Sequence, residues 1–252
     1  MSLDLRDISV RFGRVRVLEG ITAGLAAGEV TALIGPNGAG KSTLLRAAAG
    51  LLPASGAVLL DGRAAAPDAR RAAVAYMPQD TSAVSSLTLL EVVLLGRLRS
   101  LGLRLPAGLV AEAETELSRF GLAALADRTL DAVSGGQRQL VYLAQALFRR
   151  PRVLLLDEPT AALDLRHQLV VLDTVRRTAR QHGVVVAAAM HDLSLAARFA
   201  DTVLCLCGGR LDATGTPSEV LSPERLRRVY GVEAELLADS DGRPHVSPLR
   251  AV

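Results

Sequence analysis

GPNGAGKST, residues 35–43, is the stretch of this sequence that decides the fold. It fits the pattern G-x-x-x-x-G-K-[ST], in which backbone N–H groups cradle phosphates, the lysine reaches the terminal phosphates and the hydroxyl binds magnesium. Lys41 is the only lysine among 29 basic residues. An arginine-rich composition explains the scarcity of lysine elsewhere, but not why the single compact ammonium stands inside this loop. The predicted cradle consists of Gly35, Pro36, Asn37, Gly38, Ala39, Gly40, Lys41, Ser42 and Thr43.

The segments on either side of the loop have the expected context. Residues 29–34 (EVTALI) indicate a buried strand that leads into the loop. Residues 42–49 indicate a helix that ends at Gly50, so a bound phosphate would also meet the positive end of a helix. The context therefore predicts a P-loop at the edge of a parallel α/β sheet.

Composition narrows the class of protein. With 252 residues, half of them hydrophobic, the chain can bury a full core in one large domain or two fused lobes. No apolar stretch approaches the roughly 20 residues that span a bilayer, and the N-terminus lacks the apolar core of a signal peptide, so we expect a cytoplasmic location. A net charge of +3 and 3% aromatic residues argue against a nucleic-acid partner. Cys205 and Cys207 lie in an apolar strand without a second Cys or His pair, which favours packing over metal binding.

Hydrophobic periodicity divides the chain into regions. The segments LDLRDISVRF, VRVLEGITAGL, GAVLLDG and AVAYM alternate with period two and predict a small antiparallel sheet. Residues of about 82–146 have helical spacing, and from Pro151 strands alternate with helices. We predict an α/β fold: a P-loop, RecA-like parallel-sheet core (1–81 and 147–216) with a flanking antiparallel β subdomain and an inserted α-helical subdomain. Residues 217–252 should add a helix near Pro223 and a hairpin that turns at Asp241-Gly242.

Two carboxylates follow the apolar strand VLLL. Asp157 is the expected partner of magnesium, and Glu158 could orient and deprotonate an attacking water molecule. The alternative is an acidic pair that merely opens a turn before Pro159.

A second device for binding phosphate precedes a long helix. Ser134, Gly135, Gly136 and Gln137 combine a hydroxyl, unhindered amides and a helix N-terminus. The same residues could be an ordinary helix cap. If they do bind phosphate, the second device serves a nucleotide held by another copy, since one P-loop already surrounds its own.

Together these motifs resemble the nucleotide-binding subunit of ABC transporters, over residues 3–232. GPNGAGKST resembles the Walker A motif, VSGGQ the signature and VLLLDE the Walker B motif. The resemblance implies ATP and Mg²⁺ as cofactors. It also implies a head-to-tail pair of subunits in which Ser134, Gly135 and Gly136 contact the γ-phosphate held by the partner's Lys41.

Further positions match the family one by one. Gln79 resembles the Q-loop glutamine that reaches the magnesium and the attacking water, and His191 the switch histidine that holds the γ-phosphate. Asp164 resembles the D-loop aspartate that crosses the dimer interface. Phe12 stands where the family usually stacks a tyrosine on adenine, and Val133 replaces the usual leucine of the signature. The implied catalytic set is Lys41, Gln79, Glu158 and His191, and the implied magnesium ligands are Ser42, Gln79 and Asp157.

Function follows from the resemblance together with the lack of a membrane segment. The chain is expected to be an ATPase that works with a separate transmembrane permease, with a second copy of itself and, indirectly, with a substrate-binding protein. It would lie peripherally on the cytoplasmic face of the inner membrane. The segments SLTLLEVVLLGRL, LGLRL, MHDLSLAARFADTV and LSPERLRRVYGVEAELL are similar to importers of ferric siderophores, haem and cobalamin, and RRVYGVE is most similar to the siderophore branch.

Other classes fit less well. ABC ATPases of DNA repair carry a long coiled coil between the Walker A motif and the signature, and the intervening segment is too short for one. Those of the ribosome usually carry two cassettes, and this chain has one. A simpler P-loop kinase would lack SGGQ.

Overall fold

The structure, a computed structural model, describes residues 1–79, 85–97, 106–161 and 163–252. At its centre is a six-stranded sheet with the order β10-β9-β3-β8-β7-β6, parallel except for the edge strand β10. The strands are β3 (Val30–Ile34), β6 (Val74–Met77), β7 (Val153–Asp157), β8 (Val185–Ala189), β9 (Thr202–Cys207) and β10 (Arg210–Gly215). The predicted α/β class with a parallel-sheet core is confirmed.

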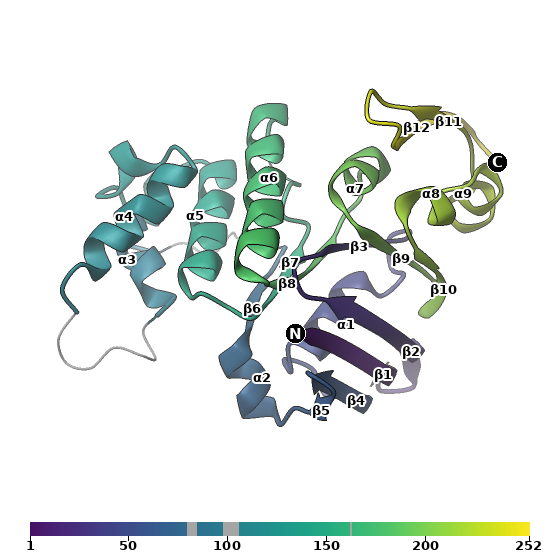
Figure 1. Cartoon of the computed structure of the whole chain (residues 1–252), viewed down its shortest axis with the longest axis horizontal. Coiled ribbons are helices and arrows are strands. Elements are labelled where there is room, and N and C mark those ends of the chain that lie inside the picture. The colour runs from purple at the N-terminus through teal and green to yellow at the C-terminus, as the bar shows by residue number, and fades with distance from the viewer. Residues whose placement is uncertain (80–84, 98–105, 162) are drawn as a thin grey trace.

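Both faces of this sheet are covered, which explains why its central strands are continuous apolar runs. Every residue of β3, β7 and β8 is buried. Along β7, Leu154 and Leu156 pack into the core shared with the helices α5 (Gly135–Phe148), α6 (Leu165–His182) and α7 (Leu193–Phe199). Val153 and Leu155 pack into a second core on the opposite face. Figure 1 shows these helices on one side of the sheet and α1 on the other.

The second core joins the parallel sheet to an antiparallel one through α1 (Lys41–Ala48). The antiparallel sheet has the order β2-β1-β4-β5. Its strands are β1 (Ser2–Phe12), β2 (Val15–Ala26), β4 (Ser55–Leu60) and β5 (Arg63–Ala64). Alternating burial along β1, with Leu3, Leu5, Ile8 and Val10 inside, is the period-two pattern that predicted this sheet.

The assignment of AVAYM to the antiparallel sheet was wrong. Its strand, β6, follows α2 (Pro67–Ala73) and pairs in parallel with β7, from Val74 opposite Val153 to Met77 opposite Leu156. Val74, Ala75 and Met77 are all buried, so the strand is covered on both faces. A strand of four residues is too short for alternation to distinguish one sheet from the other.

In its described residues, the predicted helical stretch between β6 and β7 contains α3 (Leu89–Leu95), α4 (Leu109–Arg119), the short 3₁₀ helices η2 (Ala123–Leu125) and η3 (Leu130–Ala132), and then α5. In Figure 1, α3, α4 and α5 stand together at one end of the molecule, beyond β6. The three helices share the first core, to which α3 contributes Leu89, α4 contributes Leu117 and α5 contributes Leu143. The segment LGLRL, residues 101–105, lies outside the described residues.

The C-terminal region contains α8 (Pro217–Val220), α9 (Pro223–Tyr230), and a two-stranded ribbon of β11 (Val232–Ala238) and β12 (Pro244–Ala251). The predicted helix and hairpin are both confirmed. The ribbon packs on α7, where Ser194 Oγ accepts from Val246 N at 3.0 Å. Cys205 is fully buried in β9, as predicted. Across the described ranges, no helix is both long and apolar enough to cross a bilayer.

Candidate functional site

The predicted phosphate-binding loop leaves the carboxyl end of β3 and enters α1. Gly35, Gly38 and Gly40 have φ angles of 144°, 78° and 100°, which side-chain-bearing residues rarely adopt. At Gly35 a Cβ atom would lie 2.2 Å from the carbonyl oxygen of Leu206, so only glycine fits. Asn37 and Gly38 at the tip are exposed, while Ala39 and Gly40 are buried beneath them.

Lys41 lies inside this loop and is only 6% exposed. Its Nζ donates to the carbonyl oxygens of Gly35 at 2.7 Å and Pro36 at 3.1 Å. Burial lowers the pKa of the ammonium, and the charges of Glu158 and Asp157 partly oppose that change. A phosphate oxygen would be a stronger, charged acceptor than either carbonyl. The lysine is therefore placed to bind an anion in the loop.

Ser42 and Asp157 meet across the first turn of α1 and the end of β7. Ser42 Oγ donates to Asp157 Oδ1 at 2.9 Å, and Tyr76 Oη donates to Asp157 Oδ2 at 3.1 Å. Asp157 is 2% exposed, and burial raises the pKa of its carboxyl despite both hydrogen bonds. A hydroxyl and a carboxylate are hard oxygen donors, which is the set that Mg²⁺ prefers beside a nucleotide.

Glu158 stands between two further polar side chains. Gln79 Nε2 donates to Glu158 Oε2 at 2.8 Å, and His191 Nε2 contacts Glu158 Oε1. His191 reaches this position because β8 ends just before it and Asp192 caps the start of α7. The structure thus gathers six predicted residues at the carboxyl edge of β3, β7 and β8: Lys41, Ser42, Gln79, Asp157, Glu158 and His191.

Two predicted residues, Phe12 and Asp164, and the predicted signature segment Ser134–Gln137 are not joined to this cluster by hydrogen bonds among the described residues. Phe12 is 51% exposed at the end of β1. Asp164 caps α6, accepting from His167 N at 2.8 Å and lying 2.9 Å from His167 Nδ1. These hydrogen bonds lower the pKa of the Asp164 carboxyl.

Ser134 is the N-cap of α5. Its Oγ accepts from Gln137 N at 3.2 Å, and its own N donates to Gln137 Oε1 at 3.0 Å. This reciprocal pair is a capping box, so the helix-cap interpretation of SGGQ holds in the single chain. Gly135 and Gly136 are the first residues of the helix. A contact with phosphate remains a prediction that involves a second copy.

Sequence reasoning missed two residues of the site. Tyr76 binds Asp157, and Gln139 Nε2 donates to the carbonyl oxygen of Glu158 at 2.9 Å. Gln139 is a polar residue on the apolar face of an amphipathic helix, which was the available signal. Tyr76 had only its place in a short buried strand to mark it.

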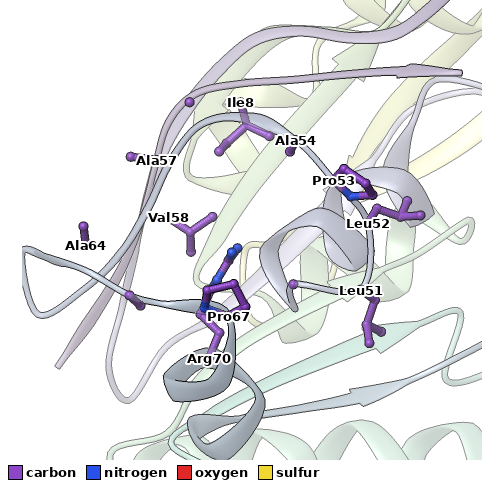
Figure 2. A pocket seen from close by; sticks show the side chains of 13 residues that line it. Ile8, Leu51, Leu52, Pro53, Ala54, Ala57, Val58, Ala64, Pro67 and Arg70 are labelled. Atoms are coloured by element: carbon purple, nitrogen blue, oxygen red, sulfur yellow. The ribbon is translucent and has the colours of Figure 1, made fainter. Parts of the chain in front are cut away.

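A separate cavity of about 450 Å³ lies between the loop after α1, the strand β4 and α2. Figure 2 shows Leu51, Pro53, Val58 and Pro67 around it, with Arg70 at one side. The Arg70 guanidinium donates to the carbonyl oxygen of Ala47 at 3.3 Å. None of the predicted site residues lines this cavity, so we assign it no part in the chemistry of the loop.

Comparisons with known proteins agree with the motifs. The family model described as ABC transporter matches residues 18–161, more than half of the chain. The hemin import ATP-binding protein HmuV of Pseudomonas aeruginosa is 46% identical over 241 residues, which cover 92% of this chain and 93% of that protein. The cobalamin import ATP-binding protein BtuD of Halobacterium salinarum is 38% identical over 257 residues, 99% of this chain, and the chain spans 64% of that protein's length. A solved structure described as an inward-facing metal-chelate type ABC transporter superposes with a TM-score of 0.84 at 25% identity, covering 99% of this chain and 98% of that chain.

Proposed function

The chain belongs to the ABC transporter family, and from this premise we propose that it is the ATP-hydrolysing subunit of an importer for metal-chelate substrates. One observation carries the proposal. Asp157 is paired with Ser42, and Glu158 is held between Gln79 and His191, both beside the Lys41 loop. Asp157 is placed to hold the Mg²⁺ that bridges the phosphates and Glu158 to orient the attacking water, which are two roles that nucleotide hydrolysis on a phosphate-binding loop requires.

In the proposed reaction, residues 35–43 bind the phosphates of ATP and Lys41 neutralises charge on the γ-phosphate. Ser42, Asp157 and Gln79 would hold Mg²⁺, which screens the charge that develops on the phosphate oxygens during transfer. Glu158 orients a water molecule and accepts its proton, while the water oxygen bonds to the γ-phosphorus and the bond to the β-phosphate oxygen breaks. Gln79 and His191 fix the Glu158 carboxylate, and His191 also contacts the γ-phosphate.

A second copy would complete each site. Ser134, Gly135, Gly136 and Gln137 of one copy cover the γ-phosphate held by Lys41 of the other, and Asp164 crosses between them. The exposed ring of Phe12 stacks on adenine. The permease docks on the helical lobe, for which we propose the boundaries 82–146, between core segments 1–81 and 147–216, with 217–252 as an extension. The complex lies at the cytoplasmic face of the inner membrane and works with a substrate-binding protein.

The cargo belongs to the class of haem, cobalamin and other metal chelates. The sequence resemblance put ferric siderophores first. The names of the relatives give more support to haem, since a hemin import protein is 46% identical over 93% of its length, and next to cobalamin. Neither a non-transport role in DNA repair or translation nor a nucleic-acid partner receives such support.

The test of the proposed reaction is Glu158→Gln. We expect the purified variant to bind Mg-ATP as tightly as wild type and to lose at least about 100-fold in ATP hydrolysis, because the base is gone and the loop is intact. The rate of phosphate release and the affinity for a fluorescent ATP analogue measure the two effects. If the variant hydrolyses ATP as fast as wild type, Glu158 is not the base and the proposed mechanism fails.

Cargo is identified in vesicles that contain the complex with its co-purified permease. Haem, cobalamin and a ferric siderophore are supplied in turn, each with its own binding protein. ATP-dependent uptake of haem alone supports the order given above. Uptake of the siderophore alone would instead support ferric siderophores as the cargo, as the sequence resemblance favoured. Uptake of none of the three contradicts the importer proposal.

A further inference from the structure

Gln139 connects the helix that begins with the signature residues to the backbone of the proposed base. It lies in α5, five residues after the cap residue Ser134, and is only 3% exposed. Its Nε2 donates to the carbonyl oxygen of Glu158 at 2.9 Å. A buried amide is costly unless its polar atoms are bonded, so this donor must be satisfied for the helix to pack.

The backbone of Glu158 has an unusual conformation. Its φ angle is +52°, in the left-handed region that a side chain disfavours by about 1–2 kcal/mol. Such a conformation persists only where its surroundings hold it from several sides. Here Glu158 N donates to the carbonyl oxygen of Ala189 in β8 at 3.2 Å. The Glu158 carbonyl oxygen accepts two hydrogen bonds, a shorter one from Gln139 Nε2 in α5 at 2.9 Å and a longer one from Ala161 N at 3.3 Å.

This conformation decides where the carboxylate lies. After the extended strand that ends at Asp157, the left-handed turn at Glu158 directs its side chain to Gln79 and His191. Without the Gln139 bond, the carbonyl would keep only the longer bond from Ala161 N within the same loop, so the peptide could relax toward ordinary φ values and the carboxylate would move. A displacement of about 1 Å in a catalytic group can cost about 100-fold in rate.

We propose that Gln139 is a positioning residue for the hydrolysis assigned to Glu158, acting through the Glu158 carbonyl. This inference rests on the proposed function. Gln139 and the Ser134–Gln137 cap belong to one helix, about one and a half turns apart. In the proposed pair of subunits, the cap contacts the phosphate bound by the other copy, while Gln139 contacts the base Glu158 of its own copy. The helix therefore connects the two sites. Through Gln139, the position of the Glu158 carboxylate depends on the position of α5.

The chain provides a matched control for testing Gln139. Gln145 lies in the same helix, and its Nε2 donates to a backbone carbonyl oxygen, that of Val92 in α3, at the same 2.9 Å. We expect Gln139→Met to lower kcat for ATP by about 10- to 100-fold while KM and ATP affinity stay within about twofold. Gln145→Met should lose comparable thermal stability and keep kcat within about twofold of wild type.

A double-mutant cycle separates positioning from general loosening of the fold. In the Glu158→Gln background, adding Gln139→Met should leave the residual rate unchanged, because no base remains to be displaced. Gln139→Leu, which removes the donor with little change in volume, is the second variant should Gln139→Met not fold, and it should show the same loss of kcat at neutral pH.

Three results would overturn the inference: an unchanged kcat in the Gln139 variants, an equal loss in Gln145→Met, or a further loss in the Glu158→Gln background. Failure of the proposed function would give a different result, because Glu158→Gln itself would then keep full activity.

Discussion

Burial keeps Asp157 in an environment that disfavours its charge. Its carboxyl is 2% exposed, and desolvation raises its pKa above the ordinary value of 3.8, although Ser42 and Tyr76 both donate to it. In the unfolded chain the same group would be fully solvated. The ionised carboxylate therefore costs the protein stability, and a bound cation would offset this cost.

Asp157→Asn should consequently stabilise the nucleotide-free protein at pH 7.5, by about 1 kcal/mol, while abolishing ATP hydrolysis. The folded pKa lies above the unfolded one, so the difference between the two proteins should shrink as pH falls through the folded pKa toward 3.8. Urea unfolding at a series of pH values from 7.5 down to about 4 measures this difference in the free energy of unfolding. Asp173→Asn, at an exposed ion pair with Arg177, is the control for net charge and should change stability by less than about 0.5 kcal/mol. A destabilised Asp157→Asn would refute this explanation.

The N-terminus of α5 has a structural role as a helix cap and a functional role that we propose. Ser134 and Gln137 form its capping box, and Thr88 and Glu91 form the same device at the start of α3. The two caps are chemically alike, with serine or threonine oxygens accepting from backbone amides at 3.2 Å. The Thr88 cap can therefore be compared, within one chain, with the Ser134 cap, for which we propose an additional contact with phosphate.

We expect Ser134→Ala and Thr88→Ala to lower the free energy of unfolding by a similar amount, about 1 kcal/mol each. Only Ser134→Ala should also lower ATP hydrolysis, by at least about tenfold, because its hydroxyl is proposed to contact the γ-phosphate of the other copy. Urea unfolding and phosphate release provide the two measurements. Equal activity in both variants would mean that SGGQ is a cap and nothing more.

The elements also show where sequence reasoning succeeded. The predictions of β3, α1 and β7 came from EVTALI, residues 35–43 and VLLLD. They succeeded because the loop motif requires a strand before it and a helix after it, and because short apolar runs of about four to six residues bounded by turn signals are typical of buried strands. Sequence reasoning failed for β6, since pairing of a four-residue strand depends on tertiary contacts. It also missed Tyr76 and Gln139, whose partners are 81 and 19 residues away along the chain. Hydrogen bonds across such separations exist only once the sheet order and the helix register are known.

At the scale of the whole molecule, the two segments for which we propose phosphate binding belong to one chain but not to one site. Lys41 with Asp157 and Glu158 lies at the carboxyl edge of the parallel sheet. The described hydrogen bonds of Ser134 stay within its own helix cap. We therefore propose that Ser134–Gln137 covers a nucleotide held by Lys41 of a second copy, since the same surface repeated by two-fold symmetry would cover both nucleotides at once.

The molar mass of Glu158→Gln in the presence of Mg-ATP tests this account most directly, because ATP then remains bound. Light scattering after size exclusion should give twice the 26.5 kDa of one chain with Mg-ATP, and the single-chain mass with Mg-ADP. Adding Ser134→Arg should leave ATP binding intact but keep the protein at the single-chain mass, since a bulky side chain on the cap blocks the shared face. An ATP-bound pair that forms equally well with Ser134→Arg would contradict the shared site.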